Sequence, residues 1–363
     1  MRKTRKTLVS LVFLVFGFTA AYGQGIQWIE AIKVPPEAKL LGPPTSFCVS
    51  EGDTFLIPIA GKIKVLEKNG NLLKCLKEFD GGNGAFVEPR YCFYSKDGKV
   101  GVLDYGARKG FIFNRNGVDD FKPIKTFNCR YFGYDIKFAG DGIQAIVSGY
   151  ITDSDGNPFD LYSININSES GEINEYLLPS HLKYGLKTHE EYVEEYFKKQ
   201  TLPAIGIKGF FDVQGDDLFY VWEGGLRVIK VSLCNKSITK VFGHETSHYT
   251  KPDGSRLSEP YIKGEFPTTW KLQESFSYVR NIFATSQNVF VVYETGKKTD
   301  SDVSTFRLQM YTLDGEFLKD LLIPGNPGRQ MCFDKENNEL FAFTKSTVDG
   351  KDELAISRYR IPR

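Results

Sequence analysis

The string His244-Glu245-Thr246-Ser247-His248 is the most direct match to known chemistry in this sequence. It fits the H-E-x-x-H pattern of zinc metalloproteases, in which both imidazoles bind the metal and the glutamate is the general base. That chemistry requires a helix, because helical i, i+4 spacing puts both histidines on one face. Gly243 precedes the string and Lys251-Pro252-Asp253-Gly254 follows it, so no helix is expected. We therefore interpret His244, Glu245 and His248 as a coincidence in a polar loop, rather than as a catalytic zinc site or an incidental metal contact.

A basic residue recurs at a similar place in five repeated units of the chain. These residues are Arg90, Arg130, Lys208, Arg280 and Arg329. If the units surround an axis, each cation lies where an innermost strand starts, and the set forms a partial ring at the mouth of a central channel. Arginine presents a planar fork to carboxylate, sulfate or phosphate, so the ring would suit an anion. Tyr91 and Tyr131 lie beside two of the cations and could stack on sugar rings.

The competing interpretation of these cations is structural. Each would pair with an acidic residue on a neighbouring unit, such as Asp104, Asp135 or Asp212, since repeats copy structural residues as readily as functional ones. Nothing else in the sequence indicates catalysis. The four histidines (181, 189, 244 and 248) lie outside the repeats, there is no Gly-x-Ser-x-Gly string or phosphate loop, and basic strand starts have the wrong sign for calcium. We predict no catalytic residue, no metal and no cofactor.

The elements that would position these residues are short β-strands. Aromatic and β-branched runs alternate with Gly, Asn and Asp turns, which is typical of an all-β chain. In residues 46–79 four strands are predicted, at Ser46–Ser50, Thr54–Ile59, Lys62–Glu67 and Asn71–Phe79, with a hairpin turn at Asn69-Gly70. First strands recur near residues 46, 91, 135, 209, 279 and 330. The short intervals are about 45 residues, the length of one four-stranded propeller blade.

The pattern predicts a six-bladed β-propeller of four-stranded antiparallel blades, with seven blades as the alternative. The sixth unit has three strands, and pairing the isolated strand Ile26–Val34 with it would close the ring. Three stretches (residues 52–74, 97–117 and 306–321) resemble the six-bladed NHL and TolB-like propellers in their order of apolar strand, further strand and polar-Gly turn. This resemblance implies a fold rather than an activity.

Two inserts interrupt the repeats. The first, at about 181–205, contains a capping box at Thr188-His189-Glu190-Glu191 and an aromatic stripe, which predict a short helix at about Glu190–Gln200 between blades three and four. That helix either packs on a blade or serves as a lid or docking element. The second insert, at about 243–270, carries the His-Glu string.

The N-terminal residues predict export. Arg2, Lys3, Arg5 and Lys6 precede an apolar run and a small-residue segment, so residues 1–23 fit a cleavable signal peptide and 24–363 a single propeller domain. No cysteine lies near the cut, so a lipoprotein is not expected. Without the signal, 42 basic and 45 acidic residues leave a net charge of −3, which argues against a nucleic-acid partner.

Three of the six cysteines, Cys48, Cys92 and Cys332, occur in matching contexts on predicted innermost strands. We interpret them as small, buried, free thiols, with pairing left open. Taken together, the sequence predicts an exported monomer, periplasmic or extracellular, with no membrane span in the mature chain. Its predicted function is binding of an anionic small molecule or saccharide at the channel mouth. A protein-interaction scaffold is the first alternative and a lactonase- or lyase-like propeller enzyme the second.

Overall fold

The computed structural model describes most of the chain, in segments. These are residues 25–35, 40, 44–50, 54–59, 61–76, 85–95, 98–115, 121–128, 133–139, 144–165, 173–179, 209–253, 256, 263–297, 303–348 and 351–362. The predicted signal peptide (1–23), the first insert and its predicted helix at Glu190–Gln200 lie outside the described residues.

Six four-stranded antiparallel sheets are formed by the described residues. Blades one to three comprise β2 (Cys48–Val49), β3 (Thr54–Ile59), β4 (Lys62–Glu67), β5 (Leu72–Leu76), β6 (Pro89–Tyr94), β7 (Lys99–Asp104), β8 (Lys109–Arg115), β9 (Phe121–Asn128), β10 (Gly133–Ala139), β11 (Gln144–Thr152), β12 (Pro158–Asn165) and β13 (Ile173–Pro179). Blades four to six comprise β14 (Gly209–Gln214), β15 (Asp217–Trp222), β16 (Val228–Ser232), β17 (Ser237–Phe242), β18 (Tyr278–Ala284), β19 (Asn288–Glu294), β20 (Phe306–Thr312), β21 (Phe317–Ile323), β22 (Met331–Asp334), β23 (Glu339–Val348), β24 (Lys351–Arg360) and β1 (Gln27–Lys33).

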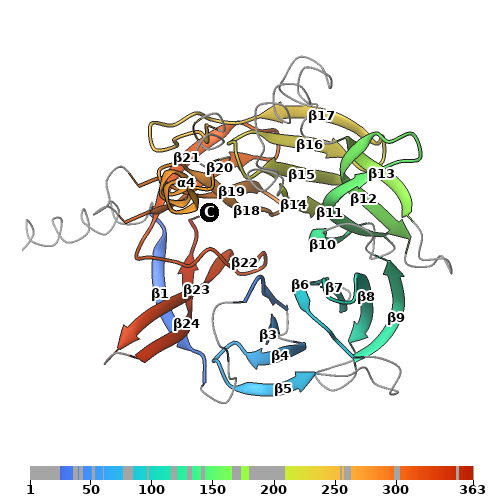
Figure 1. The fold of residues 1–363 in the computed structure, drawn as a ribbon, viewed down its shortest axis with the longest axis horizontal. Helices are drawn as coiled ribbons and strands as arrows, with labels where there is room; N and C mark the ends of the chain where they lie inside the picture. The colour runs from blue at the N-terminus through green and yellow to red at the C-terminus, as the bar shows by residue number, and fades with distance from the viewer. Residues whose placement is uncertain are drawn as a thin grey trace, which may run out of the picture.

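The sheets stand around a central axis, with β6, β10, β14, β18 and β22 innermost and β5, β9, β13, β17 and β21 on the outside (Figure 1). In blades one to five the strands run outward in sequence order. The predicted six-bladed propeller is therefore confirmed, and the seven-bladed alternative is wrong.

Blade six is built from both ends of the chain. Its strand order is β1-β24-β23-β22, and β1 pairs antiparallel with β24 from Gln27 opposite Arg360 to Lys33 opposite Ala355. This confirms the predicted closure by the isolated N-terminal strand. The blade-one hairpin turn lies against β1: Gly70 has φ +96°, and a Cβ atom there would lie 2.5 Å from the Lys33 carbonyl oxygen. Only glycine suits that position.

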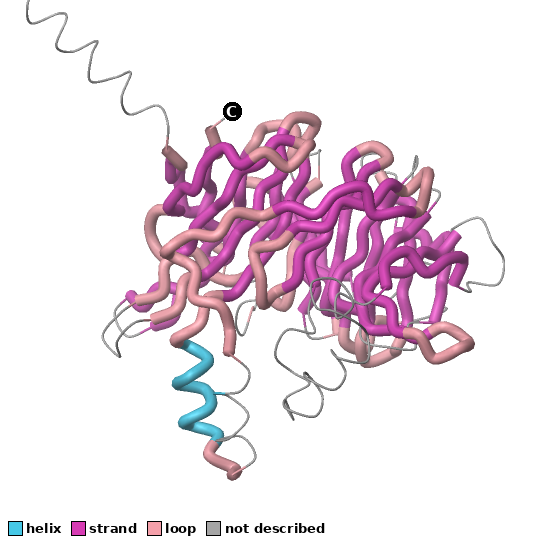
Figure 2. The backbone as a smooth tube through the Cα atoms, turned by 90° about the horizontal axis from the view of Figure 1, so that it is seen from above, coloured by secondary structure: helices cyan, strands magenta, loops and turns pink. Residues whose placement is uncertain are grey.

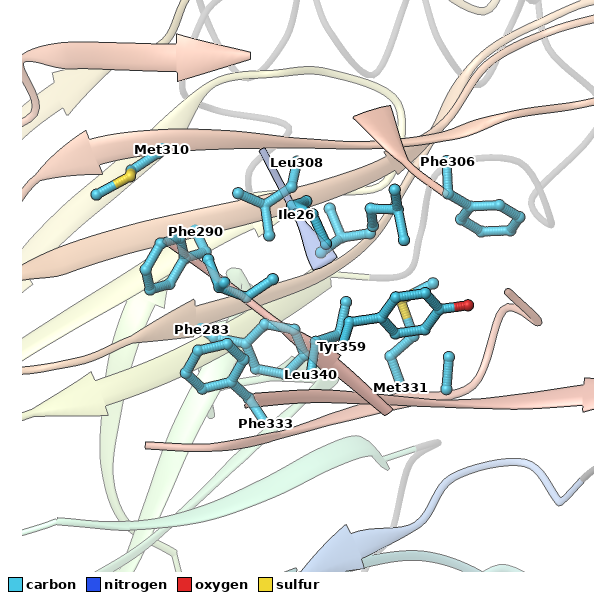
Figure 3. Packing of buried hydrophobic residues seen from close by; sticks show 14 residues of the cluster. Ile26, Phe283, Phe290, Phe306, Leu308, Met310, Met331, Phe333, Leu340 and Tyr359 are labelled. Atoms are coloured by element: carbon cyan, nitrogen blue, oxygen red, sulfur yellow. The ribbon is translucent and has the colours of Figure 1, made fainter. Parts of the chain in front are cut away.

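The core lies in layers between neighbouring blades. Between blades five and six, Phe283 and Phe290 pack against Phe333, with ring centroids 5.2 and 5.4 Å apart (Figure 3). Blade faces are covered on both sides, so the middle strands are apolar nearly throughout, and β19 is buried along its whole length. The outermost strand β17 instead has mostly exposed residues. This explains why the middle strands lack the apolar–polar alternation of a half-exposed sheet.

A helix that the sequence analysis did not predict ends the second insert. This helix, α4 (Phe266–Glu274), carries Pro267 in its first turn and has no side-chain N-cap. Its base is held because Leu272 packs against Phe276 and because Lys297 pairs with Glu274 at 2.8 Å. The helix protrudes from one face of the ring (Figure 2). Within the described segments, no helix is both long and apolar enough to cross a bilayer.

Candidate functional site

A cavity of about 90 Å³ lies on the axis of the ring, and all six innermost strands line it. One residue from each blade, in chain order, illustrates the wall: Cys48, Tyr91, Asp135, Asp212, Asn281 and Cys332. The three cysteines Cys48, Cys92 and Cys332 are buried free thiols on this wall, as predicted. The cavity thus presents a mixed polar and apolar surface to anything that reaches the axis.

At the mouth of the cavity, where the innermost strands start, two predicted cations come together around one carboxylate. Arg280 contacts Glu294 at 2.6 Å and Glu223 at 2.6 Å, and Arg329 donates to both oxygens of Glu294 at 2.8 and 3.1 Å. Glu223 follows the second strand of blade four, so the pairs link three blades. We call these four residues together with Tyr278 the mouth cluster.

The backbone explains why Arg280 turns toward these acids. The register of β18 against β19 shifts between Val279 and Asn281, which makes Arg280 the extra residue of a β-bulge. The register of β6 against β7 shifts in the same way around Arg90. Bulges change the direction of a side chain relative to a regular strand. In blade three the bulge falls at Tyr134, not at Arg130.

Arg90 does not reach the mouth cluster. It pairs with Glu88 of its own blade at 2.6 Å, and its guanidinium lies 4.0 Å from the centroid of the Tyr105 ring. Tyr91 lines the cavity but is only 9% exposed, because it packs between blades two and three. Its ring therefore offers little surface for stacking on a sugar.

The remaining predicted site residues, Arg130, Tyr131 and Lys208, lie outside the described residues. A five-membered ring of cations therefore stays a prediction. The three described cations do have acidic partners, but these are Glu88, Glu223 and Glu294 rather than the aspartates suggested by the sequence.

Tyr278 gives the mouth cluster an unused polar atom. Among the described side chains, its hydroxyl group is one of two buried polar groups without a hydrogen-bond partner. Burial, helped by the negative charge of Glu223, raises the pKa of Tyr278 to about 12. The hydroxyl group therefore keeps its proton at neutral pH.

Glu294 makes the mouth cluster sensitive to acid. Desolvation alone raises the pKa of Glu294, but Arg280 and Arg329 outweigh it and hold the pKa below the ordinary 4.5. A carboxyl group with a lowered pKa stabilises the fold above its unfolded pKa, and this contribution is lost as pH falls through the folded pKa.

We expect the free energy of unfolding to fall as the pH is lowered below about 4.5, with a smaller fall in Glu294→Gln. Urea unfolding at pH 3 to 6 measures both. An equal pH dependence in the two proteins would show that Glu294 does not contribute.

Two further ion pairs lie farther along the channel, and the sequence analysis did not assign them to the site. Lys137 contacts Asp135 at 3.1 Å, and Lys335 of blade six contacts Asp212 of blade four at 2.8 Å. Burial raises the pKa of Asp135, whereas burial alone lowers that of Lys137; the charges of Asp135 and Asp212 reverse this and raise it. The i, i+2 spacing of Asp135 and Lys137 places both side chains on the same face of a strand, and this was the signal in the sequence that could have predicted their pairing.

Each described cation that lines the cavity has a carboxylate within 3.1 Å. The mouth cluster contains two arginines and two glutamates, and the channel pairs contain two lysines and two aspartates. The described part of the site is therefore rich in charged hydrogen-bonding groups but has no excess of positive charge.

The His-Glu string lies away from this cavity. Residues 243–246 belong to no helix or strand and 247–248 form a turn, so the predicted absence of a helix is confirmed. The His244 ring stacks on Phe317 with centroids 3.7 Å apart, and its backbone amide donates to the Tyr311 hydroxyl group. Its ring serves packing on blade five.

A second hollow, of about 470 Å³, lies on blade six beside the turn between β22 and β23. Its floor contains Glu339, which is 2% exposed and accepts two hydrogen bonds from Arg358 at 2.8 Å. Arg360 approaches the same carboxylate at 3.6 Å. Two arginines therefore surround one buried glutamate here, as they do in the mouth cluster. This second site lies at the end of β22, whereas the mouth cluster lies at its start.

Comparisons with known proteins support the fold but give no information on the site. No family model matches the chain, and no curated protein matches it. Among solved structures, a Bacteroides fragilis protein described as exported aligns with a TM-score of 0.60 and 13% identity, over 93% of this chain and 96% of that one. The Cps50 (Swd1) β-propeller domain of Myceliophteria thermophila aligns at 0.49 and 11% identity, over 93% and 99%. At such identities the first likeness supports the fold alone.

Proposed function

We propose that the chain is an exported binding module that holds a saccharide over the channel mouth. Export is supported by the charged, apolar and small-residue segments of residues 1–23 and by the similar Bacteroides fragilis protein described as exported. A relationship to NHL or TolB-like propellers is part of the proposal and is supported by the repeated strand and turn strings alone.

The mouth cluster carries this proposal. A free anion needs unpaired positive charge, but Arg280 and Arg329 already share carboxylates. Sugar hydroxyl groups instead both donate and accept, so they match the adjoining guanidinium and carboxylate groups of the mouth cluster. A saccharide therefore suits the described groups better than an anion.

The ligand would rest on the mouth rather than enter the channel. Pockets for small molecules usually enclose about 300–1,000 Å³, whereas this cavity has about 90 Å³. Helix α4 stands beside the start of β18 and would form a wall next to the bound sugar.

The test is thermal unfolding of residues 24–363 with neutral saccharides, acidic saccharides and phosphorylated compounds. A saccharide at 100 times its dissociation constant should stabilise the fold by about 2.7 kcal/mol. Arg329→Ala should weaken its binding by roughly 10- to 100-fold, the effect of one charged hydrogen bond.

Arg360→Ala is the matched control. Arg329 and Arg360 are 58% and 59% exposed, each contacts a buried glutamate, and each leaves that glutamate a second arginine. An equal loss of saccharide affinity in both variants would argue against the channel mouth as the binding site. Stabilisation by phosphorylated compounds alone would indicate that the ligand is an anion and not a saccharide. No stabilisation by any compound would favour the protein-interaction alternative.

A further inference from the structure

Two buried thiols meet where the innermost strands of blades one and two lie side by side. The sulfur atoms of Cys48, on β2, and Cys92, on β6, are 3.4 Å apart. The two residues are 6% and 4% exposed, and both line the channel cavity. They are thus in direct contact across a blade boundary, with a route to the axis of the ring.

The backbone on both sides of this contact is fixed by one serine. Ser46 donates from its hydroxyl group to the Arg90 carbonyl at 3.0 Å and accepts from the Cys92 amide at 3.3 Å. The two strands therefore stay in register beside the thiols. A disulfide bond is about 2.05 Å long, so the sulfur atoms would need to approach by about 1.4 Å.

We propose that Cys48 and Cys92 form a disulfide bond that joins blades one and two. In the first step, one cysteine thiolate attacks a sulfur of an external disulfide and releases one donor thiol, leaving a mixed disulfide on the protein. The second cysteine then attacks the protein sulfur and releases the other donor thiol. Two protein thiols are oxidised, one external disulfide is reduced to two thiols, and the two hydrogens pass to those thiols.

A third buried thiol provides the competing pairing. Cys332 lines the same cavity but packs between blades six and one, against Phe47 and Phe55. Among the described cysteines, Cys48 and Cys92 are the pair with sulfur atoms in hydrogen-bonding contact. Cys234 is exposed and serves as an internal marker of an accessible thiol, although its contact with Asp216 raises its pKa.

The rate of formation in the folded protein should be slow at neutral pH. Burial, followed by the contact with Cys48, raises the pKa of the Cys92 thiol, and the thiolate is the reactive form. Oxidation should therefore accelerate as the pH is raised or when the chain is oxidised during refolding.

The experiment oxidises residues 24–363 with glutathione disulfide, both folded at pH 7 and 8.5 and during refolding. Free thiols are then blocked and non-reduced peptides are identified by mass spectrometry. We expect a Cys48–Cys92 cross-linked peptide in the wild type and in Cys332→Ser, and none in Cys48→Ala or Cys92→Ala. The bond closes a loop of 44 residues, so the thermal midpoint should rise by roughly 5 °C.

A Cys48–Cys332 peptide, or glutathione found on Cys234 with Cys48 and Cys92 still free under every condition, would overturn the proposal. The peptide map of the wild type decides between these results even if a cysteine variant does not fold.

Discussion

Replacing Asp212 by alanine is expected to lower the free energy of unfolding by about 3–5 kcal/mol, the cost of leaving a buried charge without its partner. Asp212 is 2% exposed and accepts hydrogen bonds from the Ala284 amide of blade five and from Lys335 of blade six, both at 2.8 Å. One carboxylate on blade four thus holds two other blades. Its loss removes the acceptor of the Ala284 amide and the charge partner of Lys335, which keeps its hydrogen bond to the Val213 carbonyl at 3.0 Å.

Urea unfolding followed by circular dichroism measures this loss. Asp314→Ala is the control, because the Asp314 side chain is 92% exposed and its contact with Lys230 is long, at 3.9 Å. Such surface ion pairs contribute about 0–1 kcal/mol to stability. If the two variants unfold at the same urea concentration, the Asp212 pairs do not hold the blades together.

Deleting residues 25–34 is expected to abolish the cooperative thermal transition of the protein. The deletion removes β1, which leaves the ten-residue strand β24 as an open edge. It also removes Ile26 and Ile32, which are 9% and 5% exposed and fill the layers on the two sides of blade six. Burial of each isoleucine contributes about 1.5–3 kcal/mol, and an unpaired edge recruits other chains.

Size-exclusion chromatography and thermal unfolding test this expectation, and two point variants separate packing from strand pairing. Ile32→Ser should be destabilised by about 2–4 kcal/mol, whereas Trp28→Ser, at a side chain that is 54% exposed, should change stability by less than about 0.5 kcal/mol. If the deleted chain elutes at the same position and unfolds at the same temperature as the intact protein, β1 does not close the ring.

The sequence predicts the blades well because their signals are local. Strand runs and the turn at Asn69-Gly70 place β3 and β4 at their observed bounds, Thr54–Ile59 and Lys62–Glu67. The helix α4 escaped prediction because it has nine residues and no side-chain N-cap. Only Pro267, in the first turn, indicated its start.

The site is harder to predict because its contacts are distant in sequence. Arg280 and Glu223 are 57 positions apart, so nothing local indicates that they pair. The direction of Arg280 also depends on a bulge, and a shift of one residue sends a strand side chain to the opposite face. The repeated cations were therefore visible in the sequence, but their acidic partners were not.

The shared sixth blade has a consequence for how the protein folds. Blades one to five are made of neighbouring strands, so their hairpins can form soon after the segments are available. Residue 27, however, pairs with residue 360, which lies 333 positions later. Contacts of such high sequence separation form late and slowly. Ring closure must therefore wait for the last strand, and under the proposed export this delay would let the chain cross a membrane before the ring closes.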